Sequence, residues 1–96
     1  MERSKVKVKK KICVVGLKVN QSQALESECS GIADLQFLDS RRSTDDLPTC
    51  DHVILMIRFL KKRWTKGAFR TMGHERVHLH SGGVTGVVRR IEALCA

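Results

Sequence analysis

Two short stretches in the second half of the chain place basic or hydroxyl side chains at predicted helix starts. Lys61 and Lys62 open one amphipathic segment, where positive charge opposes the helix dipole and calls for a functional explanation. Ser81-Gly82-Gly83 opens another, with Thr85 just beyond it. Backbone amides at helix starts bind phosphate and carboxylate groups. These residues therefore predict anion binding, provided that the fold brings the two turns to one edge.

Four segments are predicted to be strands. Residues 11–16 and 52–57 are continuous apolar runs rich in β-branched side chains, as in strands buried on both faces. Residues 33–38 alternate between apolar and polar, which suits an edge strand. A short strand is predicted at 76–80. The polar stretch 39–48 holds the only proline and is interpreted as a connection with a helical turn.

Three helices are predicted beside these strands. The first is weakly amphipathic, is capped by Asn20 or Ser22, and ends near Gly31. The second repeats apolar residues every four positions and ends at Gly73. The third closes the chain. The apolar positions of the last two helices are Leu60, Trp64, Ala68, Met72, Val84, Val87, Val88, Ile91 and Leu94.

The element order βαββαβα with right-handed crossovers predicts a small Rossmann-like α/β domain of three layers. Its sheet has four mainly parallel strands in the order 2-1-3-4. Ligands of such sheets bind outside the carboxyl ends of the strands, here at the switch point between the first and third strands. The predicted anion-binding residues at this edge are Lys18, Asn20, Arg58, Lys61, Lys62, Ser81, Gly82, Gly83 and Thr85.

The 96 residues carry a net charge of +8, which is concentrated in blocks. Residues 1–11 hold six basic side chains against one acidic, and residues 58–76 hold seven against one. We interpret residues 1–10 as a basic arm and residues 11–96 as one domain. Such blocks favour nucleic acid, nucleotide phosphates or an acidic protein surface. The predicted nucleic-acid contacts are Lys5, Lys7, Lys9, Lys10, Lys66 and Arg70.

Composition also bears on location and assembly. No apolar run approaches about 18 residues, so no membrane span is expected, and the basic N-terminus lacks the features of a secretory signal. Cys13, Cys29 and Cys95 lie in apolar patterns, which suits reduced thiols in a reducing, cytoplasmic compartment.

A chain this short buries only about 60% of its unfolded surface. Its thin core and open sheet edges favour a homodimer.

Two runs resemble a small bacterial domain family of unknown function. They are CDHVILMIRFLKK, from Cys50 to Lys62, and RVHLHSGGVT, from Arg76 to Thr85. The family has an "aDhVil" strand that leads to a "vsH" turn, and a later "GGvssl" phrase that opens its last helix. The resemblance spans roughly residues 11–95 and implies a Rossmann-like fold without a known function. Lys62 stands where the family has a histidine, so the role of that histidine cannot be carried over.

Each candidate group also has a structural interpretation. Ser81-Gly82-Gly83 either cradles phosphate or allows a tight turn with positive φ at glycine. The run from Lys61 to Arg63 either contacts an anion or forms a solvated helix face. Trp64 has the spacing of a core residue, and core packing is favoured over base stacking. The three phenylalanines, Phe37, Phe59 and Phe69, mostly suit the core, which leaves few aromatic side chains for stacking.

Neither a metal site nor a catalytic site is predicted. Cys50 and His52 lie at the amino end of the third strand, whereas His78 and His80 are expected near the carboxyl end of the fourth, too far away to share a metal. His74 lies near the first pair, but without a standard ligand spacing. No cofactor is predicted. A cysteine nucleophile needs an exposed thiol beside a histidine, but the cysteines are expected to be buried or at the other edge of the sheet. No two carboxylates are marked as acid and base, so we do not expect an enzyme.

Three functions remain. The first is a non-enzymatic binding protein that recognises a phosphate-bearing anion, either a nucleotide or a nucleic-acid backbone, at the carboxyl edge of the sheet. The second is a regulatory or inhibitory adaptor, of the kind found in mobile elements, that docks on an acidic protein surface. The third and most distant is a minimal phosphatase or transferase.

Overall fold

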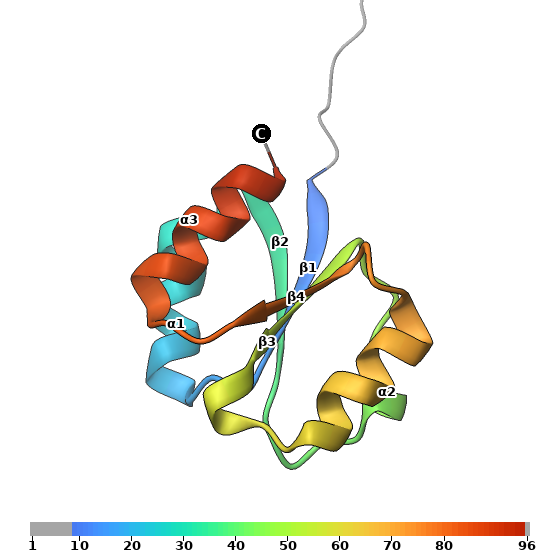
Figure 1. Cartoon of the computed structure of the whole chain (residues 1–96). Helices are drawn as coiled ribbons and strands as arrows, with labels where there is room; N and C mark the ends of the chain where they lie inside the picture. Colours follow the sequence, from blue (N-terminus) through green and yellow to red (C-terminus); the bar gives the residue numbers. More distant parts are fainter. Residues whose placement is uncertain (1–8, 96) are drawn as a thin grey trace, which may run out of the picture.

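A four-stranded sheet forms the middle layer of the molecule (Figure 1). The computed structural model describes residues 9–95. All neighbouring strands are parallel and their order is β2-β1-β3-β4, so the predicted class and strand order are confirmed. The strands are β1 (Lys10–Val15), β2 (Ala33–Leu38), β3 (His52–Met56) and β4 (Val77–His80).

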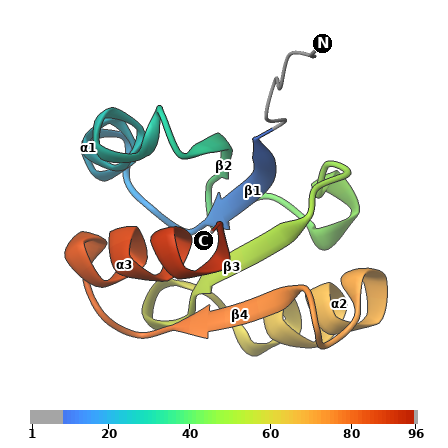
Figure 2. The same ribbon diagram turned by 90° about the horizontal axis from the view of Figure 1, so that it is seen from above.

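Helices cover both faces of this sheet. Figure 2 shows α1 (Val19–Cys29) and α3 (Val84–Leu94) on one side and α2 (Lys62–Met72) on the other. Two short 3-10 helices, η1 (Thr44–Asp46) and η2 (Ile57–Phe59), lie in the connections that follow β2 and β3. The helical turn predicted within 39–48 is therefore confirmed.

The side chains of the central strands alternate between two core clusters. In β1, Ile12 and Val14 pack with residues of α1 and α3, whereas Cys13 and Val15 pack with Trp64 of α2. All four strand residues are fully buried. Burying one apolar side chain of this size stabilises a fold by roughly 1.5–3 kcal/mol, so both faces of β1 contribute to the stability of the domain. The predictions of a central strand and of a buried Trp64 are confirmed.

The start of α1 differs from the prediction. Neither Asn20 nor Ser22 caps the helix; the cap position is Lys18. The backbone N–H of Lys18 donates to the side-chain oxygen of Gln21 at 3.0 Å, which satisfies the cap amide without a short polar side chain there. The end of α2 is as predicted, because Gly73 stops it with a φ of 85°.

Candidate functional site

The ends of three strands meet at Gly16. Its backbone N–H donates to the carbonyl of Leu38 at 2.9 Å, which joins the end of β1 to the end of β2. Its φ is 106°, and a Cβ at this position would lie 3.2 Å from the Cβ of Met56 in β3. Only glycine adopts this conformation without strain in so little space. The turn that follows therefore lies at the carboxyl edge of the sheet, between β2 and β3.

A hollow of about 510 Å³ lies over this turn, and we call it the switch-point hollow. Its volume lies within the usual range for small-molecule sites. The turn after β1, the segment after β2 and the 3-10 helix after β3 each contribute to it. Its lining residues are Gly16, Leu17, Lys18, Val19, Asp39, Ser40, Arg41 and Phe59.

Exposed apolar side chains stand at the rim of the switch-point hollow. Phe59 is 46% exposed and Val19 is 75% exposed. The prediction that Phe59 belongs to the core is wrong, because η2 turns the chain away from the sheet directly after β3. An exposed aromatic ring beside a hollow offers a flat surface on which another ring can stack.

A second, smaller hollow adjoins the first, and we call it the arginine hollow. Its volume is about 230 Å³, and it shares Arg41 with the switch-point hollow. Three arginines and two hydroxyl-bearing residues line it, and guanidinium and hydroxyl groups bind phosphate oxygens well. Its lining residues are Arg41, Arg42, Ser43, Thr44, Arg63 and Trp64.

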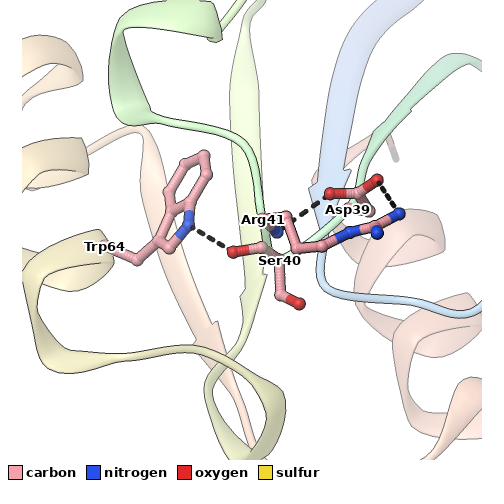
Figure 3. Close-up of polar contacts among 4 residues, drawn as sticks. All are labelled: Asp39, Ser40, Arg41 and Trp64. Atoms are coloured by element: carbon pink, nitrogen blue, oxygen red, sulfur yellow. Dashed lines mark hydrogen bonds and ion pairs between the residues drawn. The ribbon is translucent and has the colours of Figure 1, made fainter.

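The segment between the two hollows is held by the contacts drawn in Figure 3. The indole N–H of Trp64 donates to the carbonyl of Ser40 at 3.3 Å, which ties the segment to α2. The backbone N–H of Arg41 donates to Asp39 at 2.9 Å, and the guanidinium of Arg41 lies 3.5 Å from the same carboxylate. The backbone hydrogen bond and then the positive charge of Arg41 lower the pKa of Asp39, so this side chain is an ionised acceptor.

The arginine hollow is also fixed from the side of η1. Ser43 and Asp46 cap this turn reciprocally: the Ser43 hydroxyl accepts from the Asp45 N–H at 3.1 Å, and the Asp46 carboxylate accepts from the Ser43 N–H at 3.0 Å. Thr44 lies against α2 at Gly67, where a Cβ would come within 2.6 Å of the threonine methyl group. The glycine therefore allows η1 and α2 to approach closely.

The predicted anion-binding residues are distributed around the carboxyl edge. Lys18 lines the switch-point hollow. Arg58 lies exposed in η2, Lys61 caps α2 and Lys62 is its first residue. Asn20 lies in the first turn of α1 and its side chain accepts from the Gln21 N–H at 3.0 Å. Sequence reasoning did not assign a binding role to several lining residues on which the site depends, namely Asp39, Arg41, Arg42, Ser43, Thr44 and Phe59.

The turn from Ser81 to Thr85 contributes to neither of these hollows. It leads from β4 into α3, and the ring of His80 packs against it. The His80 Nε2 lies 3.2 Å from the carbonyl oxygen of Gly83, and a Cβ on Gly82 would come within 3.1 Å of the same nitrogen. The expectation of positive φ at these glycines is wrong, because among the described residues only Gly16 and Gly73 have positive φ.

The predicted nucleic-acid contacts that the structure describes fall into two groups. Lys5 and Lys7 lie outside the described residues. The ammonium of Lys9 donates to the Ser30 carbonyl at 2.8 Å, and that of Lys10 donates to the Leu94 carbonyl at 2.7 Å, both at the amino edge of the sheet. Lys10 is the first residue of β1, not part of an arm. The remaining two, Lys66 and Arg70, are exposed on α2.

The predicted separation of His52 from His78 is wrong, whereas His80 lies at the carboxyl end of β4 as predicted. The His52 Nδ1 lies 3.1 Å from the His78 Nε2. Val53 pairs with Val77, so His78 stands near the amino end of β4. Within residues 9–95 no group of three or more His, Cys, Asp or Glu side chains is arranged to hold a metal ion.

The cysteines are buried thiols. Burial raises the pKa of Cys13 to about 12, and burial also raises the pKa values of Cys29 and Cys50. A thiol held in this way is a poor nucleophile at neutral pH. All four cysteines of the chain are free, and Cys95 is partly buried.

Comparison with protein-family models, with curated proteins and with solved structures finds no match for this chain. In the described part of the chain, no helix has the length and apolar character needed to cross a membrane.

Proposed function

We propose that this protein binds a phosphate-bearing anion, a nucleotide or a nucleic-acid backbone, at the carboxyl edge of its sheet. The observation that carries this proposal is the arginine hollow, which Arg41, Arg42 and Arg63 line next to the switch point. Guanidinium groups pair with phosphate through two parallel hydrogen bonds. The hydroxyls of Ser43 and Thr44 add further donors.

The composition of the segment supports an anion as the ligand. The carboxylate at the rim, Asp39, is already paired with Arg41, which leaves Arg42 and Arg63 as the cations available to a ligand. Lys18 lines the neighbouring hollow and adds to the positive potential. Among the described residues, the ion pair between Asp39 and Arg41 is the only one at this edge.

We further propose that binding occurs without catalysis. The thiols of Cys13, Cys29 and Cys50 are buried and have raised pKa values. Asp39 lies beside a guanidinium that holds it ionised, which makes it a poor general acid. The contacting pair His52 and His78 joins the strands near their amino ends, away from both hollows.

The test is a titration of the isotope-labelled protein with inorganic pyrophosphate, in which the NMR chemical shifts of the backbone amides report binding. The double variant Arg42→Ala, Arg63→Ala should bind pyrophosphate at least roughly 10-fold more weakly, because it loses two charge-assisted contacts. The largest shifts in the unsubstituted protein should fall on residues 40–44.

The matched control is Arg76→Ala, Arg89→Ala. It removes the same charge from two exposed side chains outside both hollows. This control should retain most of the affinity. Equal weakening in the two double variants would mean that net charge alone attracts the anion, and the proposed site would then be rejected.

A further inference from the structure

We infer that the ligand is a ribonucleotide: the switch-point hollow takes its nucleoside, and the arginine hollow takes its phosphate. This inference rests on the proposed function and names the compound class that the site accepts. It uses side chains that a simple phosphate site would not need, namely Asp39 and Phe59.

Asp39 is the first of these side chains. A carboxylate repels phosphate, so its presence in the lining of the switch-point hollow is unexpected for a purely anionic ligand. Its side chain is 49% exposed, and the contacts to Arg41 leave acceptor positions free on both oxygens. Uncharged donors such as sugar hydroxyls would satisfy them.

The position of Asp39 supports sugar recognition. It follows β2 directly, and β2 lies beside β1, whose end is the turn at Gly16. In dinucleotide-binding doubly wound sheets, an acidic side chain about 20 residues beyond the first strand-to-helix turn accepts a hydrogen bond from the ribose 2′-hydroxyl. The chain lacks the glycine-rich dinucleotide signature, but this acidic position is filled.

Phe59 is the second side chain. It lines the same hollow as Asp39, together with the apolar residues Leu17 and Val19. At 46% exposed, its ring has a free surface that the protein itself does not cover. A base that stacks on an aromatic side chain increases affinity by roughly 10-fold. The apolar wall therefore suits the base, and the carboxylate suits the sugar.

The two hollows adjoin at Arg41, which lines both. A nucleoside beside Asp39 and Phe59 would therefore direct its phosphate past Arg41 toward Arg42 and Arg63. Asp39 offsets part of the positive charge of Lys18 and Arg41 in the first hollow, whereas three arginines and no carboxylate line the second. The second hollow therefore attracts phosphate more strongly than the first.

The experiment compares affinities for ribonucleoside monophosphates, 2′-deoxyribonucleoside monophosphates and inorganic phosphate, measured by NMR titration with each of the four bases. At least one ribonucleotide should bind roughly 10-fold more tightly than phosphate, because of base stacking. The corresponding deoxyribonucleotide should bind several-fold to 10-fold more weakly than that ribonucleotide, because it cannot donate to Asp39.

Two substitutions test which side chain recognises the base and which recognises the sugar. Phe59→Ala should weaken nucleotide binding roughly 10-fold and leave phosphate binding unchanged. Its control is Leu79→Ala, which truncates another exposed apolar side chain, 39% exposed, in β4. Asp39→Asn should reduce the preference for ribose over deoxyribose. Asp34→Asn, at an exposed position near the amino end of β2, is the matched charge control.

The outcomes separate this inference from the proposed function. In one outcome, phosphate binds in a way that requires Arg42 and Arg63, while no nucleotide binds more tightly than phosphate and Phe59→Ala has no effect. That result would reject the nucleotide inference and retain the proposed anion site. Failure of phosphate, pyrophosphate and every nucleotide to bind would reject both. Titration with an oligoribonucleotide shows whether the ligand is a free nucleotide or part of an RNA. Tighter binding of the mononucleotide would identify a free nucleotide as the ligand. Tighter binding of the oligoribonucleotide would identify the end of an RNA chain.

Discussion

At the scale of single residues, His52 and His78 form an unexpected contact between β3 and β4. Their rings lie with centroids 5.1 Å apart and one nitrogen pair at 3.1 Å, so one ring must donate and the other accept. Burial lowers the pKa of both rings from the ordinary value of 6.5. The positive charge of Lys10 adds to this effect at His52, and His52 and then Arg90 add to it at His78.

This contact predicts that the protein becomes less stable in mild acid. Below about pH 6.5 the unfolded chain takes up protons on these histidines while the folded protein resists them, so the free energy of unfolding falls as pH falls. His78→Gln should remove part of this decline. Urea unfolding at pH 7.5 and at pH 5.5 measures it.

The control for this pH effect is His74→Gln. His74 is exposed and stacks on Phe69 at a centroid distance of 4.4 Å, apart from the histidine pair. This variant should keep the full decline of the unmodified protein. A decline that is the same with and without His78 would show that the pair is not its source.

At the scale of elements, the arginine hollow depends on how closely η1 approaches α2. An alanine in mid-helix is ordinarily more stable than glycine by about 1 kcal/mol. At Gly67 the added Cβ would lie 2.7 Å from the Thr44 hydroxyl and 3.0 Å from the Thr44 Cβ. Gly67→Ala should therefore destabilise the protein by roughly 1–3 kcal/mol, as overpacking does. It should also weaken pyrophosphate binding, because Thr44 lines the hollow.

A double variant tests the cause of this effect. Adding Thr44→Ala removes the methyl and hydroxyl groups that Gly67→Ala would meet, so urea unfolding should show partial recovery of stability. Gly31→Ala is the control, because nothing lies within 4 Å of the Cβ that it adds. An unchanged or increased stability in Gly67→Ala alone would show that η1 adjusts without cost.

The elements themselves could be predicted from the sequence, but several contacts between them could not. The apolar runs at 12–15 and 53–56 mark strands with two buried faces, and that pattern is local. The path of the chain after β2 depends instead on the hydrogen bond between Trp64 and Ser40 and on the contact between Thr44 and Gly67. No local pattern encodes these, so the arginine hollow was missed.

The register of β4 is another feature that no local sequence pattern predicts. The sequence predicts a strand at 76–80, but pairing of Val77 with Val53 decides that His78 reaches His52. Phe59 was assigned to the core because an apolar side chain usually belongs there, and its exposure follows from the turn at η2. The family resemblance and the homodimer stay predictions.

At the scale of the whole molecule, basic groups are separated between the two edges of the sheet. Lys9 and Lys10 lie at the amino edge, whereas the arginine hollow lies at the carboxyl edge. A single nucleotide at the hollow would neutralise charge at one edge only. A long nucleic acid that contacts both edges would involve many more phosphates, and its binding would weaken far more steeply with salt.

Because a nucleotide and a long nucleic acid differ in this salt dependence, the purified native protein can be tested directly for what it carries. We expect the protein purified at low salt to carry a bound nucleotide, detected as a raised ratio of absorbance at 260 to 280 nm and as added mass in native mass spectrometry. Denaturation should release it, and Arg42→Ala, Arg63→Ala should be purified without it. A broad distribution of bound mass that disappears at high salt would indicate nucleic acid instead. The protein could instead be purified without any anion, in a stoichiometric complex with an acidic protein. That result would contradict the proposed function and favour the adaptor. The exposed basic face of α2 would then be the binding surface.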